Sequence, residues 1–81
     1  MNDRVSVILV HSRAARSVVA AALRACKVRY SYMSSASVKG HTGEVGSPTP
    51  RYTMDTTVKQ WSCLMRELDK STVRGIDAYR D

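Results

Sequence analysis

The chain has 81 residues and a mass of 9.0 kDa, which suits one small domain and excludes a large multi-step enzyme. Its 43% hydrophobic and 25% charged residues are typical of a folded globular protein, and only two cysteines exclude a disulfide-rich scaffold. No apolar run approaches the roughly 18 residues of a membrane span, and residues 5–10 are too short a run for a signal peptide. We therefore expect a small soluble protein of the cytoplasm, with no contact to a membrane.

The positive charge is concentrated in the first half of the chain. Thirteen Lys and Arg residues against seven Asp and Glu residues give a net charge of +6. Residues 1–40 carry seven basic residues against Asp3 alone, whereas residues 41–81 carry six basic and six acidic residues. The positive electrostatic field of these residues attracts nucleic acid, acidic proteins or anionic ligands. The charge alone does not identify which of them is the partner.

The first elements are predicted from a change in hydrophobic period. Residues 4–10 are almost all apolar or β-branched, which predicts a strand buried on both faces. Ser12 is a candidate N-cap for the helix that the apolar spacing predicts over residues 13–27. Residues 28–33 alternate, which predicts a second strand. A strand, a helix and a strand that are joined tightly make a right-handed βαβ unit with parallel strands.

The second half begins with a segment of small, polar and chain-breaking residues, 34–50, which predicts a long mobile loop. Residues 51–54 suit a short strand, and the apolar spacing predicts an amphipathic helix over residues 57–70. The tail, residues 71–81, is expected to add a turn or a short strand. The prediction is therefore a single α/β domain over residues 1–81, with three or four strands.

In layout the chain resembles the thioredoxin fold, and the glutaredoxins most closely. Residues 4–10 match the first strand of that family and residues 13–27 its first helix. Thr49-Pro50 before residues 51–54 matches the proline that precedes the third strand. The resemblance covers about residues 4–70, and it implies a βαβ unit followed by a long loop, a short strand and a C-terminal helix.

The chain departs from the glutaredoxins at their active site. The family has a Cys-Pro-x-Cys or Cys-x-x-Ser site between the first strand and the first helix, where this chain has His11-Ser12-Arg13-Ala14-Ala15-Arg16. Thiol–disulfide exchange needs a thiolate, so the chemistry of the family does not carry over. The resemblance then implies a non-catalytic member that serves as a binding scaffold.

The two cysteines lie on the two predicted helices. Cys26 is on the apolar face, which predicts a buried free thiol. If the two helices cover the same face of the sheet, Cys26 and Cys63 are neighbours, and a disulfide then needs Cα atoms within about 7 Å. The cysteines and histidines lack the spacing of metal ligands, so we expect no metal and no cofactor. His11 and His41 have no Asp or Cys partner at a telling distance, so no catalytic group is predicted.

The candidate binding residues lie on the first predicted helix and next to its two ends. Its basic residues fall within an arc of about 80° on the side opposite the apolar face. The helix start, with the Ser12 hydroxyl and two guanidinium groups, suits a phosphate or carboxylate, although a solvated basic helix start has the same composition. The candidate residues are His11, Ser12, Arg13, Arg16, Arg24, Lys27 and Arg29.

We expect no enzymatic activity. The leading hypothesis is an adaptor or inhibitor that binds an acidic surface of another protein; in size and charge the chain resembles viral accessory proteins that phages use against host machinery, which would place it in the host cytoplasm. One alternative is nucleic-acid binding by the basic helix face, although Tyr30 and Tyr32 share a face with Val28 and are therefore predicted in the core. The other alternative is a thiol redox protein that uses Cys26 or Cys63.

Overall fold

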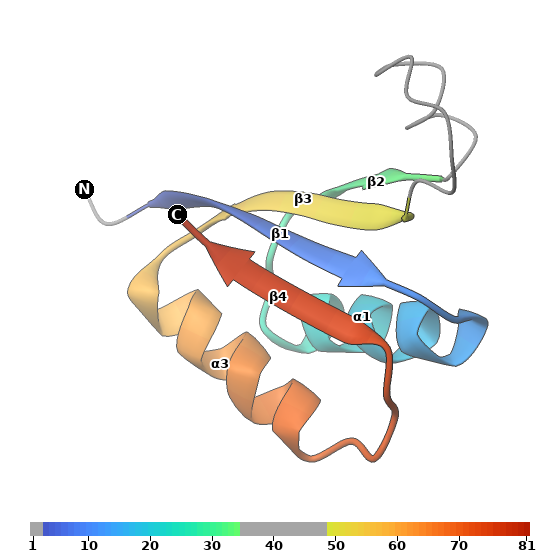
Figure 1. The fold of residues 1–81 in the computed structure, drawn as a ribbon. Helices are drawn as coiled ribbons and strands as arrows, with labels where there is room; N and C mark the ends of the chain where they lie inside the picture. Colours follow the sequence, from blue (N-terminus) through green and yellow to red (C-terminus); the bar gives the residue numbers. More distant parts are fainter. Residues whose placement is uncertain (1–2, 35–48) are drawn as a thin grey trace.

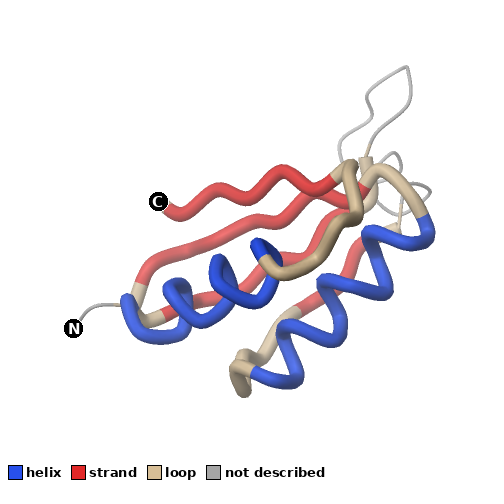
Figure 2. Tube along the Cα trace, turned by 90° about the horizontal axis from the view of Figure 1, so that it is seen from below, coloured by secondary structure: helices blue, strands red, loops and turns tan. Residues whose placement is uncertain are grey.

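The computed structural model describes residues 3–34 and 49–81, which form a four-stranded antiparallel sheet with two helices on one face (Figures 1 and 2). In chain order the elements are β1 (Arg4–Val10), α1 (Arg13–Ala25), β2 (Ser31–Met33), β3 (Arg51–Thr56), α3 (Val58–Asp69) and β4 (Ile76–Arg80). These residues form a small α/β domain. No helix in the described ranges is long and apolar enough to cross a membrane.

The order of the strands is β2-β3-β1-β4, and each neighbouring pair is antiparallel. Because β1 and β2 are both antiparallel to β3, they run in the same direction, as a βαβ unit requires. They are not neighbours, however, since β3 lies between them and offers β1 a partner of six residues against the three of β2. The unit formed by β1, α1 and β2 is therefore a split βαβ unit.

Several element boundaries differ from the predicted ones. The first strand covers the expected residues 4–10, whereas the helix expected over 13–27 ends at Ala25 and the strand expected over 28–33 is restricted to Ser31–Met33. β3 continues two residues beyond the expected strand, α3 lacks the first and last residue of the expected helix, and the tail contains β4. Most of the predicted loop over residues 34–50 lies outside the described residues.

The early end of α1 has a local cause. The backbone N–H groups of Lys27 and Val28 donate to the carbonyl oxygens of Arg24 and Leu23, at 3.2 and 3.0 Å. This pair of bonds is a Schellman motif, which places Lys27 in the left-handed region with φ of 55°. Val28 is buried, as is Leu23, so an apolar contact accompanies the motif.

Replacing Lys27 with glycine is expected to raise the free energy of unfolding by about 1 kcal/mol, because a side chain is strained in the left-handed region and glycine is not. Urea denaturation of Lys27→Gly and of the wild-type protein measures this difference. Lys59→Gly, at an exposed position inside α3, is the control and should lower stability by about the same amount. A loss of stability in both variants would contradict the strain at Lys27.

The core lies between the sheet and the two helices, and burial along β1 alternates. Ile8 and Val10 are 0% and 2% exposed, whereas Val5, on the other face, is 58% exposed. The prediction that this strand is buried on both faces is wrong, because both helices lie on one face. The buried apolar residues are Ile8, Val10, Ala15, Val19, Ala22, Leu23, Cys26, Val28, Tyr52, Met54 and Leu64.

A disulfide between Cys26 and Cys63 joins the end of α1 to α3, with Cα atoms 5.8 Å apart. The prediction of a free thiol at Cys26 is therefore wrong. The condition stated for a disulfide is met instead, because both helices cover the same face of the sheet (Figure 2). The bond fixes the position of α3 relative to α1.

Removal of the disulfide is expected to lower the free energy of unfolding by about 3–4 kcal/mol, since it closes a loop with a sequence separation of 37. Urea denaturation of the Cys26→Ala/Cys63→Ala variant measures the loss. The wild-type protein in excess dithiothreitol is the matched control and should lose a similar amount. If both unfold at the urea concentration of the oxidised protein, the disulfide does not stabilise the fold.

Candidate binding surface

Ser12 is the N-cap of α1. Its hydroxyl accepts a hydrogen bond from the Ala15 N–H at 3.0 Å, and its carbonyl accepts from the Arg16 N–H at 3.0 Å. Ser12 therefore satisfies the backbone at the helix start, as an N-cap does. A hydroxyl that accepts one hydrogen bond can still donate its own proton, so the cap is compatible with the anion site considered from the sequence.

His11 belongs to the sheet rather than to a binding site. Its Nε2 lies 2.7 Å from Oδ2 of Asp77, at the start of β4, so the expectation that it has no carboxylate partner is wrong. Its backbone N–H donates to the carbonyl of Gly75 at 2.8 Å. Gly75 has φ of 87°, and a Cβ there would lie 3.3 Å from Cβ of His11, so the close approach requires glycine. The other histidine, His41, lies outside the described residues.

Three tyrosines connect α1 to β2 and β3. The hydroxyl of Tyr52 donates to the carbonyl of Arg16 at 3.2 Å. Arg16 Nη1 donates to the hydroxyl of Tyr32 at 3.4 Å, and the guanidinium carbon lies 5.9 Å from the centre of the Tyr32 ring. The rings of Tyr30 and Tyr32 both pack on Tyr52, with centres 5.1 and 4.9 Å away. The basic side of α1 is thereby held against the β2 edge.

Two of these rings are more exposed than predicted. Tyr52 is 4% exposed, but Tyr30 and Tyr32 are 43% and 37% exposed. The prediction that both lie in the core is wrong, because β2 is an edge strand of three residues and Tyr30 precedes it. Two partly exposed aromatic rings therefore lie beside the basic residues of α1.

The basic residues form one surface, which we call the basic face. Arg16 lies on the flank of α1 that faces β2, where it contacts Tyr32, and not opposite the core as predicted. Arg13 and Arg24 are about 16 Å apart along the helix axis. The chain from Arg13 to Met33 has no acidic residue, and the ion pairs in the described ranges, His11–Asp77 and Lys70–Glu67, lie elsewhere. The basic face consists of the exposed residues Arg13, Arg16, Arg24, Lys27, Arg29, Tyr30 and Tyr32.

The tyrosine cluster changes the titration of its members. Burial raises the pKa of Tyr52, and the neighbouring Tyr30 and Tyr32 raise it further, while Arg16 and Arg24 act in the opposite direction. The hydrogen bond with Tyr32 raises the pKa of Arg16. Two cations of the basic face are therefore close enough to Tyr52 to act on its ionisation.

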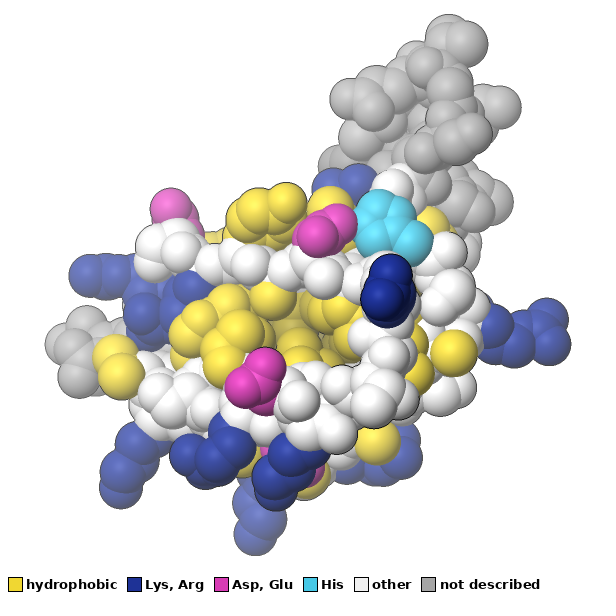
Figure 3. Space-filling model, turned by 60° about the horizontal axis from the view of Figure 1, so that its bottom comes forward, with side chains coloured by type: hydrophobic (Ala, Val, Ile, Leu, Met, Phe, Trp, Pro, Cys, Tyr) yellow, Lys and Arg dark blue, Asp and Glu magenta, His cyan; other side chains and the backbone are white. Residues whose placement is uncertain are grey.

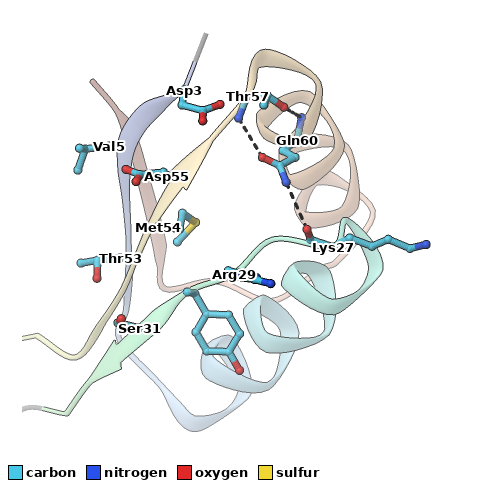
Figure 4. Close-up of a pocket in the computed structure, with 11 residues that line it drawn as sticks. Asp3, Val5, Lys27, Arg29, Ser31, Thr53, Met54, Asp55, Thr57 and Gln60 are labelled. Atoms are coloured by element: carbon cyan, nitrogen blue, oxygen red, sulfur yellow. Dashed lines mark hydrogen bonds between the residues drawn. The ribbon is translucent and has the colours of Figure 1, made fainter. Parts of the chain in front are cut away.

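A hollow of about 750 Å³ at the end of β3 adjoins the basic face (Figure 4). Lys27 and Arg29 lie on one side of it, and Asp3 and Asp55 line the other side. The side chain of Lys27 extends outward, while its carbonyl accepts a hydrogen bond from Gln60 Nε2 at 3.2 Å. This bond places the hollow where the end of α1 meets the start of α3.

The wall of the hollow on the α3 side is structural. Thr57 and Gln60 form a capping box, in which each side chain accepts a hydrogen bond from the backbone N–H of the other, at 3.1 and 3.0 Å. These polar groups satisfy one another, so they are not aimed at a ligand. The hollow extends the polar surface around Lys27 and Arg29. Among the described residues that line it, no two side chains form a hydrogen-bonded pair of catalytic groups.

Ionisation of Tyr52 is expected to occur above the ordinary tyrosine value of about 10. Because its pKa is raised in the folded state, its contribution to stability is present below pH 10 and is lost as the pH rises through the folded pKa. Absorbance titration should show one of the four tyrosines ionising late. Tyr52→Phe should remove this late component, and a late component that persists in Tyr52→Phe would contradict the assignment.

The described residues hold no group of three or more His, Cys, Asp or Glu side chains that could bind a metal ion. Comparisons of the chain with protein-family models, with curated proteins and with solved structures gave no match. The geometry of the basic face is therefore the main evidence on function.

Proposed function

We propose that the protein is a small non-catalytic binding protein, an adaptor or inhibitor, whose basic face docks on an acidic surface of another protein. The observation that carries the proposal is a set of five exposed cations and two exposed tyrosines in a stretch of chain without a carboxylate. None of the five cations forms an ion pair within the described residues, and cations without an ion-pair partner gain most from an anionic one. Arginine and tyrosine are also the residues that most often dominate binding energy at protein interfaces.

The position of Arg13 supports a role in binding. Arg13 is the first residue of α1, and the first turn of this helix has no acidic residue. A cation at the positive end of the helix dipole is unfavourable for the helix. The stability of α1 therefore does not explain this residue, whereas attraction to an acidic partner does.

The packing of the tyrosines favours a protein over a nucleic acid. The ring of Tyr32 lies beside the Arg16 guanidinium and is tilted by 51° against Tyr52, and Tyr30 meets Tyr52 at 74°. Stacked bases need a free ring face, while rings packed in this way offer edges and hydroxyl groups. On the sheet face away from the helices, Tyr79 is the one aromatic residue among those described, so a stacking platform on the sheet has little support.

The other hypotheses from the sequence contribute nothing to this proposal. The resemblance to the glutaredoxins and to phage accessory proteins remains an expectation, and the proposal does not depend on it. The redox hypothesis needs a reactive thiolate, and the disulfide between Cys26 and Cys63 gives it no support.

The proposal is tested by capture of partners from a cell lysate, with and without nuclease, using the tagged wild-type protein and an Arg13→Glu/Arg24→Glu variant. We expect a discrete protein partner that persists after nuclease treatment. Its affinity, then measured with purified components, should fall at least about tenfold in the variant, because each reversal replaces an attraction by a repulsion. The variant should melt close to the wild-type protein, because glutamate at position 13 suits the positive end of the helix dipole whereas glutamate at position 24, in the last turn, opposes it.

The matched control is Lys59→Glu/Arg74→Glu, which makes the same change in net charge at exposed positions outside the basic face. Lys59 lies in the first turn of α3, so its reversal also resembles that of Arg13 in helix position. The control should retain the partner. Partners that disappear with nuclease would show nucleic-acid binding instead, and equal binding by both variants would show that the basic face is only solvated.

A further inference from the structure

A second surface, at the other edge of the sheet, is apolar. The helix α3 buries only Leu64 completely, although its sequence has an apolar stripe. Its other apolar residues are partly buried against the core, and they meet those of β4 in a groove between the helix and the strand that Arg66, Asp69 and Ser71 also line. Figure 3 shows hydrophobic side chains gathered in this hollow, with both basic and acidic side chains around it. The apolar lining consists of Met65, Leu68, Val73, Ile76 and Ala78.

The groove lies beside a sheet edge with free backbone groups. β4 is the last strand of the sheet, and no strand among residues 3–34 and 49–81 pairs with its outer side. The Gly75 carbonyl accepts a hydrogen bond from the His11 N–H. Along two antiparallel strands, residue pairs that are hydrogen-bonded to each other alternate with pairs that are not. The N–H and C=O groups of Ile76 and Ala78 therefore point outward. The side chains of Ile76 and Ala78 line the groove, so the edge and the groove form one surface.

We propose that this surface binds an extended segment of another protein, which adds to β4 as a fifth, antiparallel strand. The backbone groups of Ile76 and Ala78 would pair with the segment, and alternate side chains of the segment would fill the groove. This inference is independent of the basic face, because it uses α3 and β4 alone.

A second copy of this chain does not fit the edge. Pairing of β4 with itself about Ala78 would place the Arg80 guanidinium opposite Ile76, on the apolar side of the sheet. Shifting the pairing by two residues in either direction places Asp77 opposite another Asp77 or opposite Asp81. The net charge of +6 on each chain adds repulsion between copies. Because β4 is a poor partner for β4 of a second copy, we assign the edge to a different chain.

The charges at β4 define the chemistry of that segment. Opposite Ile76 and Ala78 the segment needs aliphatic side chains, since these positions face the groove. Arg80 points to the same side of the sheet, where its Nε and Nη2 donate to Oγ1 and O of Thr56 at 3.1 and 3.2 Å. An acidic residue opposite Arg80 complements the guanidinium. A segment that pairs antiparallel to β4 therefore has an acidic residue first, opposite Arg80. Aliphatic residues follow at the third and fifth positions, opposite Ala78 and Ile76, and any residue suits the positions between them.

The test uses an end-blocked peptide with the central sequence Glu-Thr-Ile-Thr-Val, titrated into the full-length protein and followed by calorimetry. Two comparison peptides replace the glutamate with lysine, or both aliphatic residues with asparagine. We expect each comparison peptide to bind at least about tenfold more weakly. Amide exchange measured by NMR should slow at Ile76 and Ala78 when the first peptide binds, and it should change little at Asp77, whose N–H already faces β1.

Three variants locate the peptide. Ala78→Pro removes an outward N–H and keeps the ladder with β1, and Met65→Glu puts a negative charge in the groove. Each should weaken binding at least about tenfold. Ser62→Glu makes the same charge change as Met65→Glu at an exposed position of α3 and should leave the affinity unchanged. Circular dichroism verifies the fold of each variant, and Met65→Glu keeps the test decisive if Ala78→Pro does not fold.

Three results would overturn the inference. One is equal or undetectable binding of all three peptides. Another is peptide binding that neither Ala78→Pro nor Met65→Glu weakens. The last is a dimer in sedimentation analysis that Ala78→Pro abolishes, which would assign the edge to a second copy. The groove variants should retain the partner captured by the basic face, so this inference and the proposed function can fail separately.

Discussion

The fold depends on the pairing of β1 with β3 on one side and with β4 on the other. Ile8 pairs with Tyr52 and with Ala78, so the central strand brings together segments more than 40 residues away in the sequence. Because β1 occupies the centre, β2 and β4 become the two edges. The β2 edge leaves exposed tyrosines beside α1, and the β4 edge leaves an open groove beside α3. Both candidate surfaces therefore follow from one strand order.

A buried polar network contributes to this register. Ser6 and Thr56 are 1% and 0% exposed, and their hydroxyl groups lie 2.8 Å apart across β1 and β3. Arg80 of β4 donates to the same Thr56 hydroxyl, so three strands meet at one point. A buried hydroxyl without a partner is costly, and a shift of β1 relative to β3 would break the hydrogen bond between the two buried hydroxyl groups. The network therefore favours the observed register over its neighbours, and it aims Arg80 toward the helices.

Local patterns in the sequence predicted the elements, because each pattern reports the near neighbours of a residue. The period of 3.6 located both helices, and Ser12 caps α1 as expected. The insertion of β3 between β1 and β2 could not be predicted in this way, since no local pattern records which strand lies beside which. The sequence predicted that β1 and β2 are parallel, but it did not predict that β3 lies between them.

The same distinction explains what the sequence showed of the candidate site. The cations of α1 were found because they lie on one helix. The contacts of Arg16 with Tyr32, and of Tyr32 with Tyr52, depend on the pairing of β2 with β3 and were missed. The pair formed by His11 and Asp77 was missed for the same reason, since it depends on β4. The disulfide could be considered from the sequence only on the condition that both helices cover the same face of the sheet.

The disulfide and the open groove are connected through the stability of a small domain. A chain of 81 residues has a limited core, and a covalent bond contributes stability that packing does not supply. The bond between Cys26 and Cys63 holds α3 in place although the helix buries only Leu64 completely. Met65 and Leu68 pack against the core but are only partly buried, so part of each side chain remains available at the surface. A groove whose walls are fixed before binding also loses less conformational freedom when a partner is bound. The covalent link therefore accounts both for the stability of the position of α3 and for the apolar surface that α3 leaves open.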